Sequence, residues 1–504
     1  MSTAPPTRTD LLTSTAPPTR TALLTSTAPP TRTALPTSPV TVTAGAAAGA
    51  AAPATRGLLP VVLTATFMTA LDVFVVNVAV PSVQADLGAG PAAVQWVIAG
   101  FALALAAGLI TAGRLGDRYG RRRVFALGLA LFTLASAGCG LAPTAAALVG
   151  ARIAQGLAAA LMGPQVLAIL RTAFSGAAQA RAFAMYGLTM GVGAVFGQLI
   201  GGALIRADLF GLDWRSCFLL NLPVGLVALG LVRRCLPESR APHRPGLDPV
   251  GVLLVTVALT GLVLPLIQGR EAGWPLWTWL CLGAALALLA GFAVHQHRHT
   301  GTPLVDTGLF RSRAFAAGLL AQLAFWLGQA SFFLVLALHL QQGRGLDALG
   351  SGLVFTAIGA GYLLTSTTAH RVAARLGRQA IALGGLLMAG GLGLLGLAVH
   401  AGGTTGGVWW LAPGLFVDGL GMGLVIAPVT SVVLASVEPR LVGSAAGLLA
   451  TVQQVAGALG IALIGIVHYG AGDPVTALER SVAALAVLEL LLVGLVQLLP
   501  RRTP

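Results

Sequence analysis

The sequence predicts an all-α protein that crosses a membrane many times. Of its 504 residues, 56% are hydrophobic and only 9% are charged, whereas a soluble protein carries about 25% charged residues. A series of apolar segments follows residue 57, each near the roughly 20 residues that a helix needs to cross a bilayer. Most of the surface must therefore face lipid, and we expect a multi-pass membrane protein.

Fourteen membrane-spanning helices are expected. They lie at 58–80, 92–111, 124–141, 145–169, 182–204, 216–235, 249–268, 275–294, 314–340, 349–368, 379–399, 408–435, 443–468 and 481–499. If the N-terminus is cytoplasmic, the inner segments hold 24 of the 30 arginines and the outer loops five. Because basic residues favour cytoplasmic loops, this bias predicts fourteen spans with both termini in the cytoplasm. The lysine-free composition, rich in Ala, Gly, Leu and Arg, indicates a GC-rich bacterial genome, so the plasma membrane of a bacterium is expected.

The composition excludes several classes of function. A net charge of +14 could indicate nucleic acid, but the arginines lie in short loops between apolar spans rather than on one soluble face. All basic residues are arginines, and a phosphate-binding loop of the Walker type needs a lysine. ATP-driven transport by this chain alone is therefore excluded, and no cofactor is expected. The four cysteines show no metal-ligand spacing and are interpreted as packing residues.

The first 56 residues differ from the rest. They begin with three near-perfect copies of a twelve-residue repeat, at 2–13, 14–25 and 26–37. Proline pairs and small polar residues cannot build a core, so a disordered cytoplasmic tail is predicted. No cleavable signal peptide precedes the first span, which we therefore expect to remain in the membrane.

The apolar part of the chain shows an internal repeat. The loop at 370–378 is a degenerate copy of the loop at 113–123, and the segments 156–164 and 419–428 both run glycine-rich up to a proline. Such repeats indicate two related halves. The expected division is a six-helix bundle at 57–236, a linker with two extra transmembrane helices at 237–313, a second six-helix bundle at 314–500, and a cytoplasmic end at 501–504.

The loop at 113–123 is too highly charged for hydrocarbon, so it must be a tight, water-facing turn between two spans. It resembles the signature loop between helices 2 and 3 of the major facilitator superfamily. The matching residues are Gly113, Leu115, Asp117, Arg118, Gly120, Arg121 and Arg122. The resemblance implies a secondary transporter with the major facilitator fold, two six-helix bundles plus two central linker helices. It also implies that this loop acts at a cytoplasmic gate.

Asp72 lies inside the first apolar span. A carboxylate there is costly and normally marks an ion or substrate path, although a structural hydrogen bond between helices is an alternative. The segment resembles the first-span signature of the fourteen-helix drug:proton antiporters. The matching residues are Leu71, Asp72, Val76, Asn77, Val78, Ala79 and Pro81. The resemblance implies proton coupling at Asp72 in a cavity that Asn77 also lines.

Three further polar residues are candidates for that cavity. Arg152 and Gln155 belong to a segment that resembles the Arg-x-x-Gln-Gly motif of the same family. The resemblance implies that Arg152 orients a coupling carboxylate, whereas an arginine near a helix end can also extend to the interface. Asp418 stands near the internal-repeat counterpart of Gln155, which favours the central cavity. For Glu489, in the last span, a structural or lipid-edge role is expected.

A glycine face is expected in the fifth span, at Gly193, Gly197, Gly201 and Gly202. This spacing admits a neighbouring helix closely, and it resembles the antiporter signature of exporters in the superfamily, with Gln198 where proline is usual. Residues 213–225 resemble another pattern of the fourteen-helix branch, and Trp214 beside Arg215 is interpreted as an interfacial anchor.

Other polar groups are less specific. His295, His297 and His299 are interpreted as a solvated flank rather than a metal site, because no acid or cysteine accompanies them in the sequence. Four glutamines, at 322, 329, 453 and 454, either line a polar cavity or join neighbouring helices.

The predicted function is proton-coupled efflux of small hydrophobic or cationic compounds, drug- or antibiotic-like, by a monomer that works with substrate, protons and membrane lipid. The energy source would be the proton motive force. An importer or uniporter of a metabolite on the same fold is the alternative. A membrane enzyme is disfavoured, since the sequence shows no clustered set of His, Cys or Ser/His/Asp residues.

Overall fold

The computed structural model describes residues 57–241, 246–299, 303–438 and 441–499, so the repeats of the tail and the end at 501–504 lie outside the described residues. The described chain is helical throughout and contains no strand. Its elements are α1 (Leu58–Leu87), α2 (Pro91–Tyr119), α3 (Arg121–Gly140), α4 (Ala145–Ala173), α5 (Gly176–Ala207), η1 (Leu209–Gly211), α6 (Arg215–Leu219), α7 (Asn221–Cys235), α8 (Pro249–Gln268), α9 (Leu276–Arg298), η2 (Thr307–Arg311), α10 (Arg313–Leu338), η3 (His339–Gly343), α11 (Ala348–Ser366), α12 (Ala369–Leu376), α13 (Gln379–Gly402), η4 (Val408–Trp410), α14 (Ala412–Ala435), α15 (Val442–Tyr469) and α16 (Pro474–Val496).

The prediction of an all-α polytopic membrane protein is confirmed. Within the described residues, 13 helical segments are long and apolar enough to cross a membrane. The fourteenth predicted span, 481–499, forms most of α16, which begins earlier, at Pro474. Three charged side chains, those of Glu479, Arg480 and Glu489, fall within every stretch of this helix long enough to cross a membrane, so it is not among the 13.

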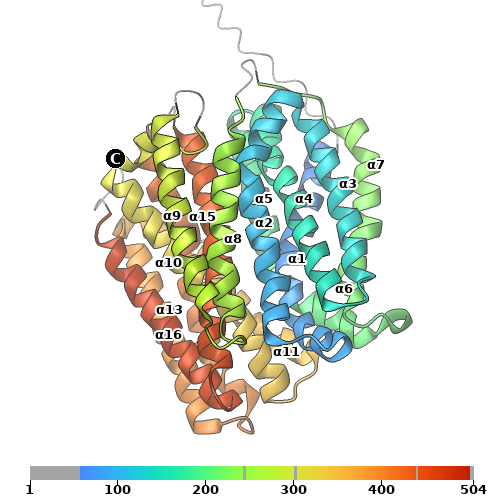
Figure 1. Cartoon of the computed structure of the whole chain (residues 1–504), viewed down its shortest axis with the longest axis vertical. Helices are drawn as coiled ribbons and strands as arrows, with labels where there is room; N and C mark the ends of the chain where they lie inside the picture. Colours follow the sequence, from blue (N-terminus) through green and yellow to red (C-terminus); the bar gives the residue numbers. More distant parts are fainter. Residues whose placement is uncertain (1–56, 242–245, 300–302, 439–440, 500–504) are drawn as a thin grey trace, which may run out of the picture. The chain divides into compact units, whose positions relative to one another are not determined.

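The helices pack in two sets. Before the linker, α4 packs against α2 and α3, and α1 packs against α5; after it, α13 packs against α14 and α16, while α10 packs against α15 and α16. Two seams join the sets, α5 on α11 and α2 on α15. The linker helices α8 and α9 pack on each other, and α8 also contacts α2 and α15 (Figure 1).

Glycines allow the closest of these contacts. A Cβ atom at Gly156 of α4 would lie 2.3 Å from the carbonyl oxygen of Phe101 in α2. A Cβ atom at Gly419 of α14 would lie 2.1 Å from the carbonyl oxygen of Ile358 in α11. Both approaches involve backbone atoms, which cannot swing aside, so only glycine permits them. The glycine-rich segments before Pro164 and Pro428 therefore serve equivalent packing roles in the two sets.

Candidate functional site

Asp72 is fully buried in α1 and forms an ion pair with Arg152 of α4. The Nη1 atom of Arg152 lies 2.5 Å from Oδ2 of Asp72, and the side chain of Arg152 is 1% exposed. The guanidinium also donates from Nε to the carbonyl oxygen of Val97 in α2 at 3.0 Å. Arg152 therefore does not extend to the membrane interface, and that interpretation is wrong.

The second carboxylate oxygen of Asp72 is held by two amides. Gln155 donates to Oδ1 from Nε2 at 2.8 Å, and Asn221 of α7 donates to the same atom at 3.3 Å. Ser136 of α3 joins both amides, since its hydroxyl accepts hydrogen bonds from Gln155 at 3.2 Å and from Asn221 at 3.0 Å. Side chains from α1, α3, α4 and α7 thus form one closed polar network.

Aromatic rings complete the surroundings of Arg152. The guanidinium carbon lies 4.3 Å from the ring centroid of Phe101 and 5.7 Å from that of Phe218. Cation–π contact of this kind stabilises a desolvated guanidinium. Burying two charges costs several kcal/mol per ion, which only good geometry and satisfied hydrogen bonds offset. The network supplies both, so the burial of the Asp72–Arg152 ion pair is compensated inside an apolar bundle.

The structure joins only some of the predicted cavity residues. Asp72, Arg152 and Gln155 meet, but Asn77 donates to the carbonyl oxygen of Phe74 in its own helix at 3.3 Å. Asp418 lies in α14 and takes no part in the network; it is 1% exposed, and neither of its carboxylate oxygens has a hydrogen-bond partner. Glu489 is equally buried in α16, so the expectation of a lipid-edge position is wrong.

Sequence reasoning missed Asn221 and Phe218. Both belong to the pattern at 213–225, which was interpreted as a signature for classification rather than as part of a site. Trp214 of the same pattern is not an interfacial anchor, because its side chain is fully buried and its Nε1 donates to Asp86 at 3.0 Å. The sequence does contain an indication for Asn221. An amide within an apolar span is costly to bury unless it has a hydrogen-bond partner, so it points to a polar neighbour.

The glycine face of α5 packs on two helices. Cβ atoms at Gly193, Gly197 and Gly201 would lie within 3.0 Å of side chains of α1, including Val75. Gly202 faces a different helix, α11, where a Cβ atom would lie 2.4 Å from the carbonyl oxygen of Ala348. The face therefore joins α5 to its own set through three glycines and to the other set through the fourth.

The charged segment at 113–123 is a tighter turn than expected. α2 runs to Tyr119 and α3 begins at Arg121, so Gly120 alone separates the two helices, with a φ angle of 113°. Asp117 accepts hydrogen bonds from Nη2 of Arg121 at 2.8 Å and from its Nε at 3.2 Å. The ion pair thus bridges the turn and fixes the direction in which α3 leaves it.

The start of the linker folds over this turn. Glu238 accepts a hydrogen bond from the backbone N–H of Arg122 at 3.2 Å, and it also lies 3.7 Å from the side chains of Arg122 and Arg123. A Cβ atom at Gly120 would lie 2.5 Å from Oε1 of Glu238. Arg114 donates to the carbonyl oxygens of Gly246, at 3.0 Å, and Pro303. Glu238, like Asn221 and Phe218, is a residue that the sequence did not single out.

Comparison with known proteins assigns the family. The sequence matches the Major Facilitator Superfamily over residues 62–461. The chain belongs to the Major Facilitator Superfamily. The resemblance found in the sequence is thereby confirmed, and the protein is a member of a transporter family rather than an enzyme family.

Relatives of this facilitator carry names that concern antibiotics. A probable actinorhodin transporter of Streptomyces coelicolor is 41% identical over 89% of this chain and 79% of its own length. A tetracenomycin C resistance and export protein of Streptomyces glaucescens is 35% identical over 80% of this chain and 74% of its own. A puromycin resistance protein of Streptomyces alboniger is 37% identical over 82% of each chain.

Solved structures agree on the fold of this facilitator. The crystal structure of a POT family transporter in complex with 5-aminolevulinic acid has a TM-score of 0.66 and covers 88% of this chain and 97% of that one. At 16% sequence identity, this likeness concerns the fold alone.

In this facilitator, hydrogen bonds across the seams gather at one end. Gln341 of η3 donates to the carbonyl oxygen of Val78 at 3.0 Å, and Gln342 donates to Gln84 of α1 at 2.7 Å. Arg206 at the end of α5 pairs with Asp347, which precedes α11, at 3.0 Å. All three contacts join the end of α1 or α5 to the loop between α10 and α11.

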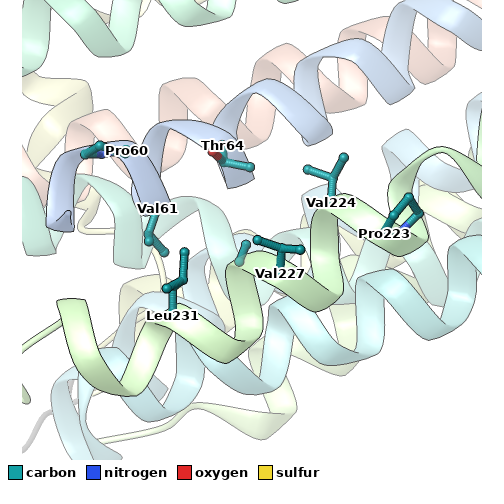
Figure 2. Close-up of a pocket in the computed structure, with 8 residues that line it drawn as sticks. Pro60, Val61, Thr64, Pro223, Val224, Val227 and Leu231 are labelled. Atoms are coloured by element: carbon teal, nitrogen blue, oxygen red, sulfur yellow. The ribbon is translucent and has the colours of Figure 1, made fainter.

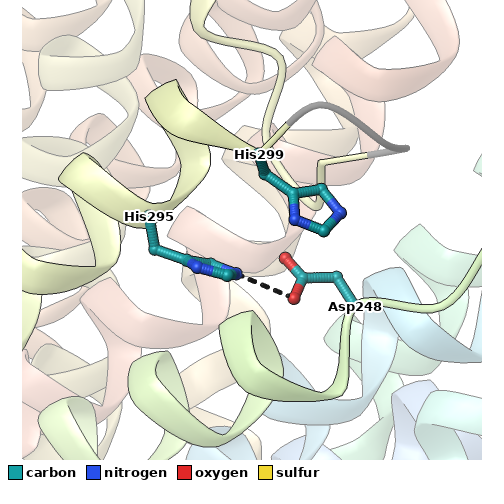
Figure 3. Close-up of side chains that lie close together, drawn as sticks. All are labelled: Asp248, His295 and His299. Carbon is teal, nitrogen blue, oxygen red and sulfur yellow. Dashed lines mark hydrogen bonds and ion pairs between the residues drawn. The ribbon is translucent and has the colours of Figure 1, made fainter.

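An acid does accompany the histidines at the end of α9, so that part of the sequence interpretation is wrong. Asp248 caps α8, accepting from the N–H of Gly251 at 2.8 Å and from Gln296 at 2.7 Å. It also accepts from His295 at 3.0 Å (Figure 3). Burial would raise the pKa of Asp248, but the hydrogen bonds from His295, Gly251 and Gln296 lower it to about 2. Ligand atoms of Asp248, His295 and His299 lie within 4.8 Å of one another. They could hold a metal only by giving up the bonds that join α8 to α9.

A groove of about 390 Å³ runs between α1 and α7 (Figure 2). Pro60, Val61 and Thr64 line one side of it, and Val224, Val227 and Leu231 line the other. Apart from the Thr64 hydroxyl the named side chains are apolar, as a surface in contact with acyl chains requires.

Proposed function

We propose that this facilitator exports small drug-like compounds from a bacterial cell in exchange for protons, by alternating access. Relatives named as a transporter, an export protein or a resistance protein match at least 80% of the chain, which supports efflux of drug-like compounds. The observation that carries the proton coupling is Asp72, a carboxylate buried in α1 and held by Arg152, Gln155 and Asn221.

Asp72 would act as the group that senses the conformational state. In the state described here it has no contact with water and is neutralised by Arg152. Any movement that separates the two side chains, or admits water beside them, leaves the carboxylate with less stabilisation and makes proton uptake favourable. Protonation of Asp72 would in turn break its ion pair with Arg152. Proton binding at Asp72 and the packing of α1 on α4 would therefore be coupled.

The moving parts would be the two six-helix bundles, at 57–236 and 314–500. The proposed topology, with both termini in the cytoplasm, makes the loop between α10 and α11 external. The hydrogen bonds of Gln341, Gln342 and Arg206 across the seams then close the outer side. We therefore interpret this state as facing inward, ready to take substrate from the cytoplasm or the inner leaflet while Asp72 is ionised.

The turn at Gly120 would control the inner side. Asp117 and Glu238 provide the acidic partners of an arginine cluster there. Because these ion pairs join α2, α3 and the linker at a single residue turn, breaking them changes the angle between two helices of the first bundle. That change would favour one state over the other without any contact to substrate.

A susceptibility panel on an efflux-deficient host tests the function. Cells that carry the wild-type chain should tolerate at least one compound of the panel better than cells with an empty vector, and Asp72→Asn should abolish the difference at equal membrane level. Export in everted vesicles should respond to a pH gradient. Increased accumulation of the compound in cells with the wild-type chain would instead support the importer.

A further inference from the structure

Asp418 and Glu489 are two buried carboxyl groups for which the described part of the chain provides no ion pair. Each side chain is 1% exposed. Neither oxygen of Asp418 has a hydrogen-bond partner, and Oε2 of Glu489 has none. Asp72, equally buried, has Arg152 and two amides. The buried acid of the first half therefore has an ion pair and hydrogen bonds, whereas the two buried acids of the second half lack an ion pair within the described residues.

The packing holds both groups beside α13. A Cβ atom at Gly391 of α13 would lie 2.5 Å from the backbone nitrogen of Asp418, and one at Gly385 would lie 3.4 Å from the carbonyl oxygen of Glu489. These glycines are six residues apart, about 9 Å along the helix. A Cβ atom at Gly328 of α10 would lie 3.1 Å from Oε1 of Glu489. Glycine at 328 thus leaves the space that the carboxyl group fills.

The buried polar side chains of α10, a helix that packs on both α14 and α16, are uncharged. Gln322 and Gln329 of α10 are each 3% exposed, and the Oε1 atom of each lacks a donor. Titratable residues of the described elements that pack on α14 and α16 are Arg313, His339, Tyr362, His370, Arg371, Arg375, His400, His468, Tyr469, Glu479 and Arg480. Apart from Tyr362 and the residues of α12, these lie in or next to the terminal turns of their helices. The titratable side chain that interacts with Glu489 from within the bundle is that of Asp418 itself.

We propose that Asp418 and Glu489 are a second proton-binding site of this transporter, which takes up and releases protons during export separately from Asp72. An ionised carboxylate without a partner is far more costly in an apolar core than a neutral carboxylic acid. Each group therefore holds a proton in the state described here, and an ionised group forms only when water or a cation reaches it. Proton uptake converts a carboxylate and one proton into a carboxylic acid, with no other reactant.

The role of this site in export rests on the proposed function. Whether Asp418 and Glu489 hold protons does not depend on transport. It predicts that a cycle moves more than one proton, one at Asp72 and at least one in the second bundle. Buried acids within spans are typical of proton pathways. Gly391 and Gly385 lie about 9 Å apart along α13. In the proposed topology this separation places Asp418 nearer the outer end of the bundle and Glu489 nearer the inner end.

Infrared titration of the purified full chain tests the occupancy. Near neutral pH the wild type should show the C=O band of protonated carboxylic acids, and Asp418→Asn and Glu489→Gln should each remove part of it. Asp72→Asn and the matched control Glu479→Gln, an acid of α16 that pairs with His400, should leave it intact. A band that is unchanged in the Asp418→Asn/Glu489→Gln double variant overturns the proposal.

Proton counting in liposomes tests the role in export, with ethidium as the probe. The number of protons that enter per ethidium exported should fall by about one in Asp418→Asn or Glu489→Gln, while Glu479→Gln keeps the wild-type ratio. An unchanged ratio with active efflux overturns the coupling role. Ethidium efflux without proton movement in the wild type would contradict the proposed function instead, and the infrared result would still decide whether the site holds protons.

Discussion

The Nη1 atom of Arg152 lies 2.5 Å from Oδ2 of Asp72, between two helices of the first bundle. Because the pair joins α4 to α1, it contributes to packing as well as to chemistry. Removing one member of a buried pair costs about 3–5 kcal/mol, since the other charge stays buried without compensation. Variants of either residue must therefore be separated into effects on stability and effects on coupling.

Asp72→Asn and Arg152→Met should each lower the free energy of unfolding by about 3–5 kcal/mol, and the double variant by clearly less than the sum. Thermal unfolding of the purified chain in detergent measures this double-mutant cycle. The control pair is Arg206 and Asp347, whose side chains are 63% and 49% exposed, with an expected coupling of about 0–1 kcal/mol. Additive losses at Asp72 and Arg152 would refute the buried pair.

Asp117→Asn should reduce transport steeply while equilibrium substrate binding changes little, because the lost bond to Arg121 alters the turn and not the cavity. Its effect on stability should be small, about 0–1 kcal/mol, since the Asp117 side chain is 34% exposed. Initial rates of efflux in vesicles and ligand-binding titrations measure the two quantities. Glu271→Gln, at an exposed carboxyl group that accepts from Ala92, is the control. Normal flux, or loss of the protein from the membrane, would rule out a gate role for Asp117.

Two adjacent glycines of α5 should respond differently to alanine. Gly201→Ala crowds Val75 within the same bundle, so it should destabilise every conformation, by about 1–3 kcal/mol. Gly202→Ala crowds the backbone of Ala348 across the seam, so it should destabilise only the state in which the outer ends are closed. Gly187→Ala, with open space around the new atom, should be neutral.

Labelling of a cysteine introduced near Asp347 measures the second effect. Modification from the outer side should become faster in Gly202→Ala and stay unchanged in Gly187→Ala. Equal labelling rates in all three proteins would mean that this contact does not hold the outer side closed.

The contact between α8 and α9 should weaken only in strong acid. Folding lowers the pKa of Asp248 from its ordinary 3.8 to about 2. A carboxylate whose pKa is lowered by folding adds stability that is present above 3.8 and lost as the pH falls toward about 2. Hydrogen-exchange protection at the start of α8 should therefore persist from neutral pH to about pH 4 and then decline. Asp248→Asn should show weaker protection without that decline, and a wild-type decline already above pH 5 would contradict the assignment.

Much of the fold could be predicted because the length of an apolar segment and the positions of arginines can be read from a short stretch of sequence. The spans, the turn at 113–123 and the glycine face of α5 each depend on a short stretch of sequence. The ion pair could be predicted only in part: Asp72 and Arg152 are conspicuous since charges inside spans are rare, but 80 residues separate them, and no sequence spacing shows that they meet.

The remainder depended on contacts between distant segments. Glu238 lies in a polar linker where an acid is unremarkable, and only the fold brings it to Gly120. Asp248 was overlooked for the same reason, because 47 residues separate it from His295. The position of Glu489 in the last helix predicts a structural or lipid-edge role, but α10 and α13 pack against it and exclude the lipid edge. In each case the residue that determines the surroundings of the acid lies in another, distant segment of the chain.

The position of α8 has a consequence for how compounds dissolved in lipid can reach the interior. α8 lies against α2 and α15, one helix from each bundle, and so covers the edge where those two meet. Neither α8 nor α9 makes comparable contact with α5 or α11. Separation of α2 from α15 would have to displace α8, whereas separation of α5 from α11 would displace neither linker helix. In the proposed export cycle, sideways entry from the bilayer would therefore be directed to the α5–α11 edge. α5 itself carries the exposed apolar side chains of Met185, Leu188 and Met190.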